Sequence, residues 1–348
     1  MLFRTISKDE LPALVRGFAE EHEVIGPIRR GGVTVFDEVG SRPEALCVDY
    51  TSTVLPPKKE LFPPKETLFS FDTMDNSTTD VPIQAVPRVL FGLHPCDIAA
   101  ISQMDRVFLD GGYRDPYYAA QRDATMIVGL SCMPDENCFC NVWGTGEVSS
   151  GYDLFLHDIG ERYLVTILSV RAAEILANST DAQDASEHDN ELYRERLHER
   201  AKAFAPAPCT DGLAMNMDAC FSDDSFWQSV GGECLSCGAC ANVCPNCHCF
   251  DMCDVLSVDG KEGRRERVWD SCTSPSFSTV TGGHNFRPTP ASRVRDRFYH
   301  KFVGFPSRYG EVMCTGCGRC VSACKVHIDP RAVLQALQSV GKNEETAK

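Results

Sequence analysis

The sequence predicts an α+β chain: an N-terminal α/β domain with a short, partly parallel sheet, followed by a smaller, cysteine-rich domain. Apolar runs at Arg88–Leu93 and Thr125–Leu130 flank a helical pattern, which is typical of two parallel strands joined by a crossover helix. Prolines then interrupt the chain near residue 206. We therefore expect the two domains to span residues 1–205 and 206–348.

The N-terminus carries the pattern of a helix start. Ser7 and Glu10 have the spacing of a capping box, in which each residue bonds the backbone of the other. Apolar residues follow at helical spacing from Leu11 to Phe18. The first helix should therefore run to about Glu21.

Extended structure is expected next. The segments Val33–Val39 and Ala45–Val48 are predicted to be extended. Two Pro-Pro pairs within Leu55–Leu68 argue against both a helix and a central strand, because proline lacks the amide hydrogen that either would use. This segment is predicted to be an extended arm that contacts a partner, or else a surface loop without a role.

Four cysteines follow the two predicted parallel strands. Cys96 comes after the first strand, Cys132 after the second, and Cys138 and Cys140 lie in the next loop. Because ligands of open α/β sheets bind at the carboxyl ends of the strands, these thiols should converge on one edge. They predict a metal site, most simply a 4Fe–4S cluster. Free buried cysteines, which pack as small apolar side chains, are the alternative.

The remaining elements are predicted from periodicity and from helix-boundary residues. They are a strand pair at Tyr152–Leu156 and Tyr163–Leu168, a helix at Val170–Leu176, a charged helix or tether at Asp181–Glu199, a last helix at Pro330–Val340 and a polar tail at Gly341–Lys348.

Two cysteine runs in the second domain repeat the spacing C-x2-C-x2-C-x3-C. In two-cluster ferredoxins this run gives three thiolates to one 4Fe–4S cluster, and its fourth cysteine ligates the other cluster. A ferredoxin-like domain with two clusters and crosswise ligation is therefore predicted. The expected ligands are Cys234, Cys237, Cys240 and Cys324 for the first cluster, and Cys314, Cys317, Cys320 and Cys244 for the second.

Zinc and disulfides are the alternatives for these runs. Structural zinc prefers two separated C-x2-C pairs or mixtures of cysteine and histidine, which a doubled run of four cysteines fits poorly. Disulfide frameworks suit small secreted domains and not a chain of 348 residues. The spacing thus favours iron–sulfur clusters.

Residues 245–313 form an insertion between the two runs that is much longer than a minimal ferredoxin would carry. It contains Cys247, Cys249, Cys253 and Cys272. These thiols could hold a further metal site or form a thiol cage around the first two clusters, with His248 and His284 as less favoured ligands. The sequence thus predicts at least two 4Fe–4S clusters, a third at the N-terminal cysteines, and leaves a fourth open.

Charge and composition limit the possible functions. The formal net charge of −15 argues against nucleic-acid binding, since nucleic-acid binders carry basic surfaces. No stretch approaches the roughly 18 apolar residues of a membrane helix, and the N-terminus lacks a signal-peptide core. With 19 cysteines, we expect a cytoplasmic protein that binds metal, in an anaerobe.

The region from Lys261 to Lys301 departs from the acidic average. Basic side chains there would offset the negative charge of a cluster and raise its potential, although a solvated basic face is the alternative. Its nine basic residues are Lys261, Arg264, Arg265, Arg267, Arg287, Arg293, Arg295, Arg297 and Lys301, against the acids Glu262, Glu266, Asp270 and Asp296.

Taken in order along nearly the whole chain, several motifs resemble those of one family. They are HPCDIAAI, IVGLSC, CLSCGACANVCPNCHCFD, WDSC and CTGCGRCVSAC. The resemblance is to the 4Fe–4S dicluster subunits of sulfhydrogenases (the beta subunit), of anaerobic sulfite reductases and of flavin oxidoreductases associated with heterodisulfide reductase. One departure is Lys325, which follows Cys324 where such runs usually continue with proline; with His327 nearby, it could raise the potential of that cluster.

The resemblance implies a non-catalytic electron-transfer subunit. It would pass electrons between a flavin protein that uses NAD(P)H and a terminal hydrogenase, sulfite reductase or heterodisulfide reductase, within a hetero-oligomer. The eight cysteines of the two runs would be its cluster ligands.

The absence of a complete nucleotide-binding motif agrees with that implication, since Gly144-Thr145-Gly146 is only half of a dinucleotide fingerprint. The alternatives are a flavin-binding enzyme that uses its N-terminal domain, and a structural zinc scaffold.

Overall fold

The computed structural model describes the backbone of residues 2–345 and the side chains of residues 3–339. The chain forms two compact units, each assembled from separate segments. Residues 58–84, which the sequence placed in the first domain, group with the second unit. The first unit comprises Met1–Pro57, Ala85–Ala207 and Thr315–Gly318, and the second comprises Lys58–Gln84, Pro208–Cys314 and Arg319–Lys348.

The first unit is built on a mixed eight-stranded sheet with the strand order β10-β1-β9-β8-β7-β6-β2-β3. Its neighbouring strands β2, β6, β7 and β8 are parallel, and the outer pairs are antiparallel, so the predicted partly parallel sheet is confirmed. The strands are β1 (Leu2–Ser7), β2 (Glu23–Arg30), β3 (Val33–Glu38), β6 (Arg88–Leu93), β7 (Thr125–Leu130), β8 (Leu154–Asp158), β9 (Arg162–Ile167) and β10 (Gln183–Asp184).

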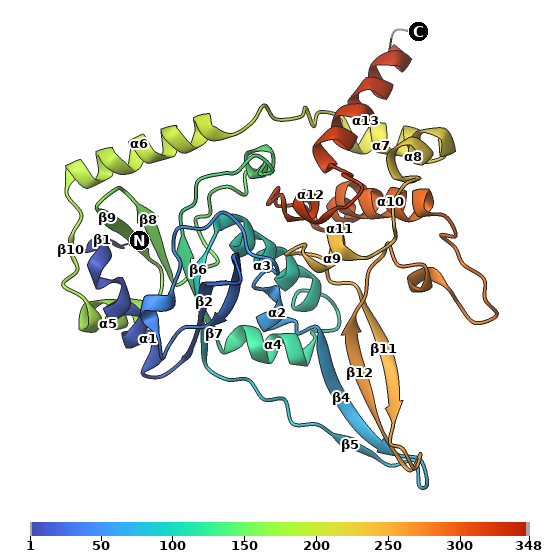
Figure 1. Ribbon diagram of the computed structural model, residues 1–348, viewed down its shortest axis with the longest axis horizontal. Coiled ribbons are helices and arrows are strands. Elements are labelled where there is room, and N and C mark those ends of the chain that lie inside the picture. Colours follow the sequence, from blue (N-terminus) through green and yellow to red (C-terminus); the bar gives the residue numbers. More distant parts are fainter. Residues whose placement is uncertain (1, 346–348) are drawn as a thin grey trace. The chain divides into compact units, whose positions relative to one another are not determined.

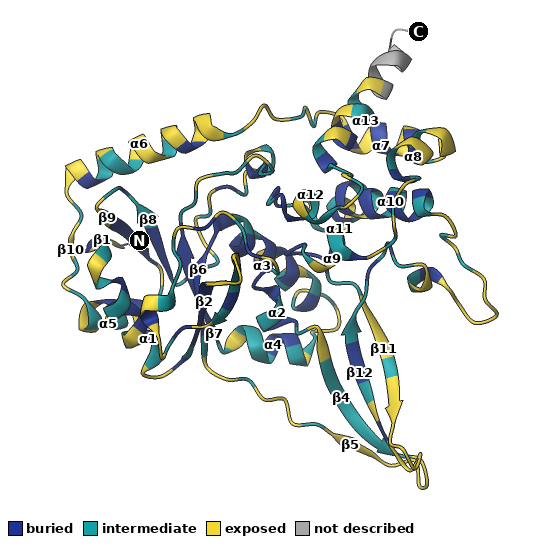
Figure 2. Ribbon diagram, in the orientation of Figure 1, coloured by how far each residue is buried: buried dark blue, intermediate teal, exposed yellow. Residues whose placement is uncertain are grey.

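The predicted crossover unit is present. Strands β6 and β7 have the predicted bounds and pair in parallel, and between them the chain forms α3 (Pro95–Phe108) and α4 (Pro116–Asp123). All six residues of β7 are buried, as in the covered strands of α/β sheets. Figure 2 shows these central strands in the colour of buried residues.

The first helix is confirmed, but it is shorter than predicted. Ser7 and Glu10 form the expected capping box before a short 3-10 turn, Lys8–Glu10. The helix α1 then runs over Leu11–Ala19 and buries its apolar face against α5 (Val170–Ser179).

Of two predictions about extended structure, the first is confirmed only at Leu46 and the second is wrong. Residues 45–48 form no strand; Leu46 makes only an isolated bridge with Ile28 after a 3-10 turn at Pro43–Ala45. Between the two Pro-Pro pairs the chain forms a one-turn helix, α2 (Lys58–Leu61), and β4 (Lys65–Asp72) begins directly after the second pair. The prolines lie at the element boundaries, where a missing amide hydrogen costs little.

The second unit combines short helices with a four-stranded antiparallel sheet of order β11-β12-β4-β5. Figure 1 shows β4, β11 and β12 side by side, and in Figure 2 most of β11 is exposed. The remaining strands are β5 (Thr78–Asp80), β11 (Phe250–Leu256) and β12 (Glu262–Trp269). The helices are α7 (Leu213–Cys220), α8 (Asp224–Gly231), α9 (Ala239–Asn242), α10 (Pro290–Tyr299), a π-helical turn (His300–Gly304), α11 (Phe305–Tyr309), α12 (Arg319–Ala323) and α13 (Pro330–Glu345).

Two helices extend beyond their predicted ends. The charged segment of the first unit is a helix, α6 (Glu187–Ala203), and α13 continues past Val340 to Glu345. The last residues of the predicted polar tail, 346–348, lie outside the described residues. Among the described residues, no helix combines the length and the apolar character that crossing a bilayer requires.

Candidate metal centre

The first cysteine run lies on a loop of the second unit that leads into α9. Two residues of this loop have left-handed backbone angles, Ser236 (φ 55°) and Gly238 (φ 73°). The second run repeats both turns, with Gly316 (φ 62°) and Gly318 (φ 73°) at the corresponding positions. Glycine suits these turns because it has no Cβ to resist a positive φ. The two runs therefore share a backbone conformation as well as a spacing.

Thiols from both runs line one cavity in the second unit. Cys234, Cys237 and Cys240 of the first run lie on its wall together with Cys324, the last cysteine of the second run, and with Cys320. The cavity holds about 50 Å³, several times the space that one water molecule needs. The predicted ligand set of the first cluster thus surrounds a single space.

The surroundings of these thiols suit an anionic cluster. Two backbone amides donate hydrogen bonds to thiol sulfurs, Ser236 N–H to Cys234 Sγ (3.4 Å) and Ile328 N–H to Cys324 Sγ (3.3 Å). Arg297 and Lys325 line the same cavity, so Lys325 lies where the sequence placed it. Hydrogen bonds to sulfur and nearby cations stabilise the thiolate form and raise the reduction potential of a cluster.

The insertion brings a second group of thiols together. Cys244 lies within electrostatic reach of Cys247, and Cys249 lies within electrostatic reach of Cys272. Cys240, on the first cavity, lies within electrostatic reach of Cys247 and Cys272. Through Cys240, this second group of thiols lies next to the predicted ligand set of the first cluster. It includes three of the four insertion thiols named in the sequence analysis, Cys247, Cys249 and Cys272.

The fourth thiol of the insertion lies elsewhere, as does one of the two candidate histidines. Cys253 is on β11, where its neighbour is the carboxylate of Asp251. The side chain of His284 is exposed, and its ring packs on Phe286. Neither residue therefore takes part in the second group of thiols.

The other three insertion thiols line a larger cavity of the second unit. Cys247, Cys249 and Cys272 lie on the wall of this space, whose volume is about 530 Å³. His248, the other candidate histidine, lies there too, together with His300. Thiols and imidazoles, both of them common metal ligands, thus face one space.

Three buried cations surround these thiols. Lys58 (2% exposed) donates hydrogen bonds to the carbonyls of Ala241 (3.2 Å) and Cys247 (2.8 Å). Arg297 (8% exposed) donates to Cys247 Sγ at 3.5 Å and to the Cys240 carbonyl at 3.0 Å. Burying a charge without a counter-charge costs several kcal/mol, so these cations indicate negative charge on the sulfur atoms nearby.

Lys301 (6% exposed) is the third of these cations. It donates to Cys244 Sγ at 3.5 Å, to the Asn246 side-chain oxygen at 2.9 Å and to the Met313 carbonyl at 2.9 Å. Burial alone would lower the pKa of Lys301, but the thiols of Cys244 and Cys247 raise it above its ordinary value. Lys301 therefore stays charged beside the sulfurs.

His300, on the larger cavity, is uncharged at neutral pH. Burial and then the charge of Lys301 lower the pKa of His300 to about 4. A neutral imidazole keeps a free lone pair and is the form that binds metals. Cys272 is also shifted, since a hydrogen bond from Cys249 lowers the pKa of its thiol to about 7.

In the first unit, Arg200 joins two of the four N-terminal cysteines. Its guanidinium donates to the Cys132 carbonyl (2.7 Å) and lies 3.9 Å from Cys132 Sγ and 3.8 Å from Cys140 Sγ. Burial raises the pKa of Cys140 to about 11, although Arg200 acts in the opposite direction. The structure thus brings these two thiols to one cation.

Cys138 and Cys96 are placed less distinctly. Cys138 lies within electrostatic reach of Cys140, in the turn that Asp135 stabilises. Cys96 is in the first turn of α3, at the carboxyl end of β6. The prediction that all four thiols form one metal site stays a prediction.

The segment Thr315–Gly318, which contains Cys317, belongs to the first unit. Phe139 N–H donates to the Gly316 carbonyl (2.8 Å), and the Thr145 hydroxyl donates to the Thr315 carbonyl (2.7 Å). A side chain at Gly316 would lie 2.5 Å from backbone atoms of Phe139, which explains why glycine is needed there. Cys317 consequently lies within electrostatic reach of Cys140.

The first unit also contains a cavity of about 510 Å³ beside these cysteines. Its wall includes Cys132 and Arg200 together with the rings of Tyr50, Tyr163 and Tyr193. Cavities of this size accommodate small ligands and cofactors.

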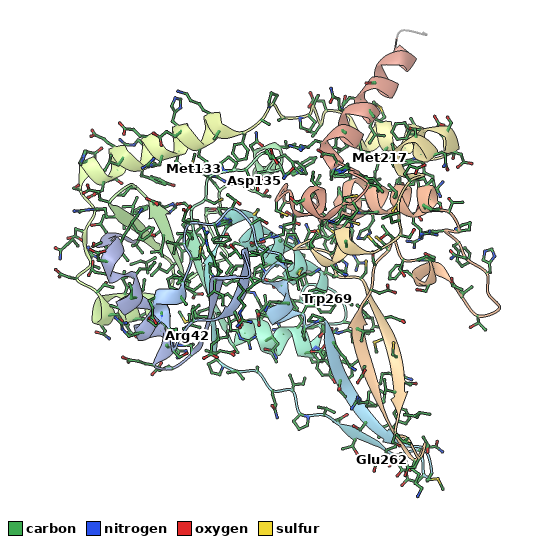
Figure 3. The ribbon with its side chains drawn as sticks, viewed as in Figure 1. Arg42, Met133, Asp135, Met217, Glu262 and Trp269 are labelled. Atoms are coloured by element: carbon green, nitrogen blue, oxygen red, sulfur yellow. The ribbon has the colours of Figure 1, made fainter. Side chains whose placement is uncertain are left out.

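Two functional residues were missed by sequence reasoning. Lys58 lies in the segment that was expected to be an exposed arm, and Arg200 lies in the segment described as a charged helix or tether. Neither has a sequence motif, since each contacts cysteines that are 60 or more positions away in the chain. Figure 3 labels Trp269, whose ring is 4.3 Å from Lys58 Nζ and gives a second contact for that buried cation.

Among the described residues, no three His, Cys, Asp or Glu side chains are placed to share one metal ion. That finding concerns single ions. In a 4Fe–4S cluster each thiolate binds a different iron atom, which is a different arrangement from several ligands on one ion.

Comparison with known proteins identifies the class. A family model described as a 4Fe-4S dicluster domain matches residues 233–328, which include both cysteine runs. The chain is therefore an iron–sulfur protein that binds 4Fe–4S clusters.

The family follows from a full-length relative. The chain is 38% identical over 339 residues to the sulfhydrogenase 2 subunit beta of Pyrococcus furiosus, an alignment that covers 97% of this chain and 99% of the relative. The chain belongs to the 4Fe–4S dicluster electron-transfer subunit family that includes this beta subunit, as the motifs predicted. The comparison with solved structures gave no match.

Proposed function

We propose that the chain relays electrons through 4Fe–4S clusters between a flavin protein that uses NAD(P)H and a terminal catalytic subunit of a hetero-oligomeric complex. The observation that carries this proposal is the cavity lined by Cys234, Cys237, Cys240 and Cys324, because it joins the two ends of the dicluster domain. Such a subunit needs closely spaced clusters and little else, since the cofactor supplies the redox chemistry.

Neighbouring thiols support a continuous route within each unit. In the second unit, Cys240 of the first ligand set neighbours Cys247 and Cys272. In the first unit, Cys140 neighbours Cys317, a proposed ligand of the second cluster. Electrons could therefore pass between clusters without a diffusing carrier.

The residues of the chain would set the conditions for this transfer. Bound clusters supply one-electron redox chemistry. Backbone amides at Ser236 and Ile328 hold the ligating sulfurs by hydrogen bonds, and the buried cations balance their charge. Apolar side chains such as Val294 and Phe298 restrict water at the first ligand set.

The terminal subunit is proposed from the family. The name of the Pyrococcus relative favours a hydrogenase. Sulfite reductase and heterodisulfide reductase are the terminal enzymes of other family members. A cytoplasmic location and an anaerobic source remain expectations from the sequence.

The complex purified under anaerobic conditions with Cys237→Ala tests the proposal. Removing one ligand should remove one cluster, about four iron atoms per chain. Electron transfer from NAD(P)H to the terminal acceptor should then be lost, while each partner subunit still reduces or oxidises an artificial dye. Iron content, coupled activity and the two dye assays are the measurements.

Cys209→Ala is the matched control, because Cys209 is an exposed thiol outside every ligand set proposed here. It should leave iron content and coupled activity unchanged. Full coupled activity in Cys237→Ala would contradict the relay, as would loss of the dye reactions themselves.

A flavin-binding role for the first unit is the second candidate. The cavity of about 510 Å³ favours it, because aromatic rings and Arg200 line a space beside candidate cluster ligands. The flavin content of the chain purified without its partners decides between the two: about one flavin per chain would support an enzyme, and none would support the relay alone.

A further inference from the structure

We propose that Cys247, Cys249 and Cys272 hold a further 4Fe–4S cluster in the second unit, with His300 as its fourth ligand. It is additional to the two clusters of the dicluster domain and is called the third cluster below. This inference deepens the proposed electron relay and rests on it for its role, but not for its existence. The dicluster domain accounts for two clusters and for the eight cysteines of the two runs. The three insertion thiols are additional to those eight.

Geometry is the first support. The three thiols come from the loop after α9 and from the segment after β12, yet all line the same cavity of about 530 Å³. That volume exceeds the needs of a single ion. Cys253, only a few residues away, lies on β11 beside Asp251 instead, so the grouping does not follow from local cysteine density.

The buried cations are the second support. Cys247 and Cys244 are within electrostatic reach of Lys58, Arg297 and Lys301 alike. Lys58 also reaches Cys249, and Arg297 also reaches Cys272. The thiolates of a cluster would supply the negative charge that these cations need.

A carboxylate on the same cavity has cations of its own. Asp296 lines the cavity, but it is paired with Arg287 (2.8 Å) and Arg295 (3.4 Å). These two arginines already neutralise the negative charge of Asp296, so Asp296 is not the counter-charge of Lys58, Arg297 and Lys301. Arg297 and Lys301 contact thiol sulfurs, and Lys58 lies within electrostatic reach of them.

The backbone around His300 is the third support. The α10 helix changes to a π-helical turn at His300–Gly304, and this turn carries both His300 and Lys301. Such turns interrupt regular hydrogen bonding and occur frequently at functional sites. Here the turn places the His300 imidazole and the Lys301 side chain on the wall of the cavity that the three thiols line.

The third cluster would extend the relay. Cys240, a proposed ligand of the first cluster, lies beside Cys247 and Cys272, so the two clusters would be neighbours within one unit. An electron could then reach the 530 Å³ cavity from the first cluster in one step.

Iron content tests the site directly. The full chain with Cys272→Ser, produced anaerobically, should contain about four fewer iron atoms and four fewer sulfides than the parent. Cys253→Ser is the matched control from the same insertion and should match the parent. An unchanged iron content in Cys272→Ser would overturn the proposal, as would zinc in the parent at this site.

A second measurement covers the case in which Cys272→Ser fails to fold. Lys58→Met should keep the parent's iron content and shift one reduction step to a more negative potential, since a cation beside the cluster is removed. Lys59→Met is its control, because the neighbouring Lys59 pairs with Glu60 instead. No shift in Lys58→Met would overturn the proposal.

These outcomes are independent of the relay. Iron content and potentials are measured on the chain alone. Loss of the third cluster in Cys272→Ser with coupled activity intact would leave the proposed relay standing and confine the third cluster to another role.

Discussion

The N-terminal cysteines of the first unit and the insertion thiols of the second unit differ in the buried cations that lie beside them. In the first unit, Arg200 approaches Cys132 and Cys140, at 3.8–3.9 Å. In the second unit, three buried cations surround the insertion thiols, and two of them approach a sulfur to 3.5 Å. Since cations stabilise the reduced, more negative state of a cluster, clusters of the second unit should have the higher potentials. Electrons would therefore collect there.

The basic segment Lys261–Lys301 shows the same distinction within one stretch of sequence. Arg265, on β12, pairs with Asp254 across the exposed hairpin, whereas Arg297 and Lys301 are buried at the thiols. Figure 3 labels Glu262 and Trp269, the first and last residues of β12. The basic residues thus divide into an exposed part on the hairpin and a part that is buried at the thiols.

The largest expected effect is on the protein without clusters. Removing iron with a chelator takes the cluster charge away from Lys58, Arg297 and Lys301 in the second unit and from Arg200 in the first. The second unit should lose several kcal/mol more stability than the first, the usual cost of a buried charge that loses its partner. Hydrogen exchange of both units, before and after chelation, measures the difference.

Lys58→Met sharpens this comparison. It should partly restore the stability of the second unit in the iron-free chain, because an apolar side chain replaces a buried cation that has lost its counter-charge. Lys59→Met should restore nothing. Equal loss of protection in both units after chelation would contradict the role given to the cations.

A smaller effect is expected from single cations in the loaded protein. Arg297→Met should lower the potential of a second-unit cluster by roughly tens of millivolts, because a charge close to the sulfurs is lost. Arg200→Met should lower the potential of the N-terminal site by less, given its longer distances. Redox titration followed by EPR measures both.

Each of these variants has a control of its own. Arg265→Met and Arg194→Met remove exposed arginines that pair with Asp254 and Glu187, and both should leave the potentials unchanged. A larger shift from Arg200→Met than from Arg297→Met would reverse the comparison.

Local patterns predicted the parts of the structure that depend on neighbouring residues. The bounds of β6 and β7 follow from two apolar runs, and the capping box of Ser7 and Glu10 follows from spacing alone. The ferredoxin spacing also predicted that Cys324 lies with the thiols of the first run, and these thiols line one cavity; their ligation of a cluster stays a prediction.

The remaining features depend on contacts between distant parts of the chain. Lys58 reaches Cys247 over 189 positions, and nothing near Lys58 in the sequence indicates that it is buried. The prolines around it were interpreted as marks of an arm, although they only bound α2 and β4. Arg200 was missed for the same reason, since a charged helix such as α6 does not reveal which one of its cations turns inward.

The smallest expected effect concerns pH and distinguishes the histidines of the two units. Burial lowers the pKa of His157 in the first unit to about 4, whereas burial acts together with the Lys301 charge on His300 in the second. A histidine with a lowered pKa binds fewer protons when folded than when unfolded. Its neutral form therefore stabilises the fold fully above about pH 6.5, and this contribution is lost as pH falls toward 4.

His157→Gln tests this in the first unit, where His157 Nε2 lies 3.0 Å from the Thr166 hydroxyl. The parent should lose stability between about pH 6.5 and pH 4, by roughly 1.4 kcal/mol for each unit by which the pKa is lowered. The variant should lose less over the same range, because glutamine does not titrate. Hydrogen exchange of β8 and β9 at several pH values measures both, with His188→Gln, an exposed histidine of α6, as the control. An equal loss of stability on acidification in the parent and in His157→Gln would show that His157 is charged in the folded protein. The first unit would then hold one more positive charge, and the two units would differ less in buried positive charge than their arginines and lysines suggest.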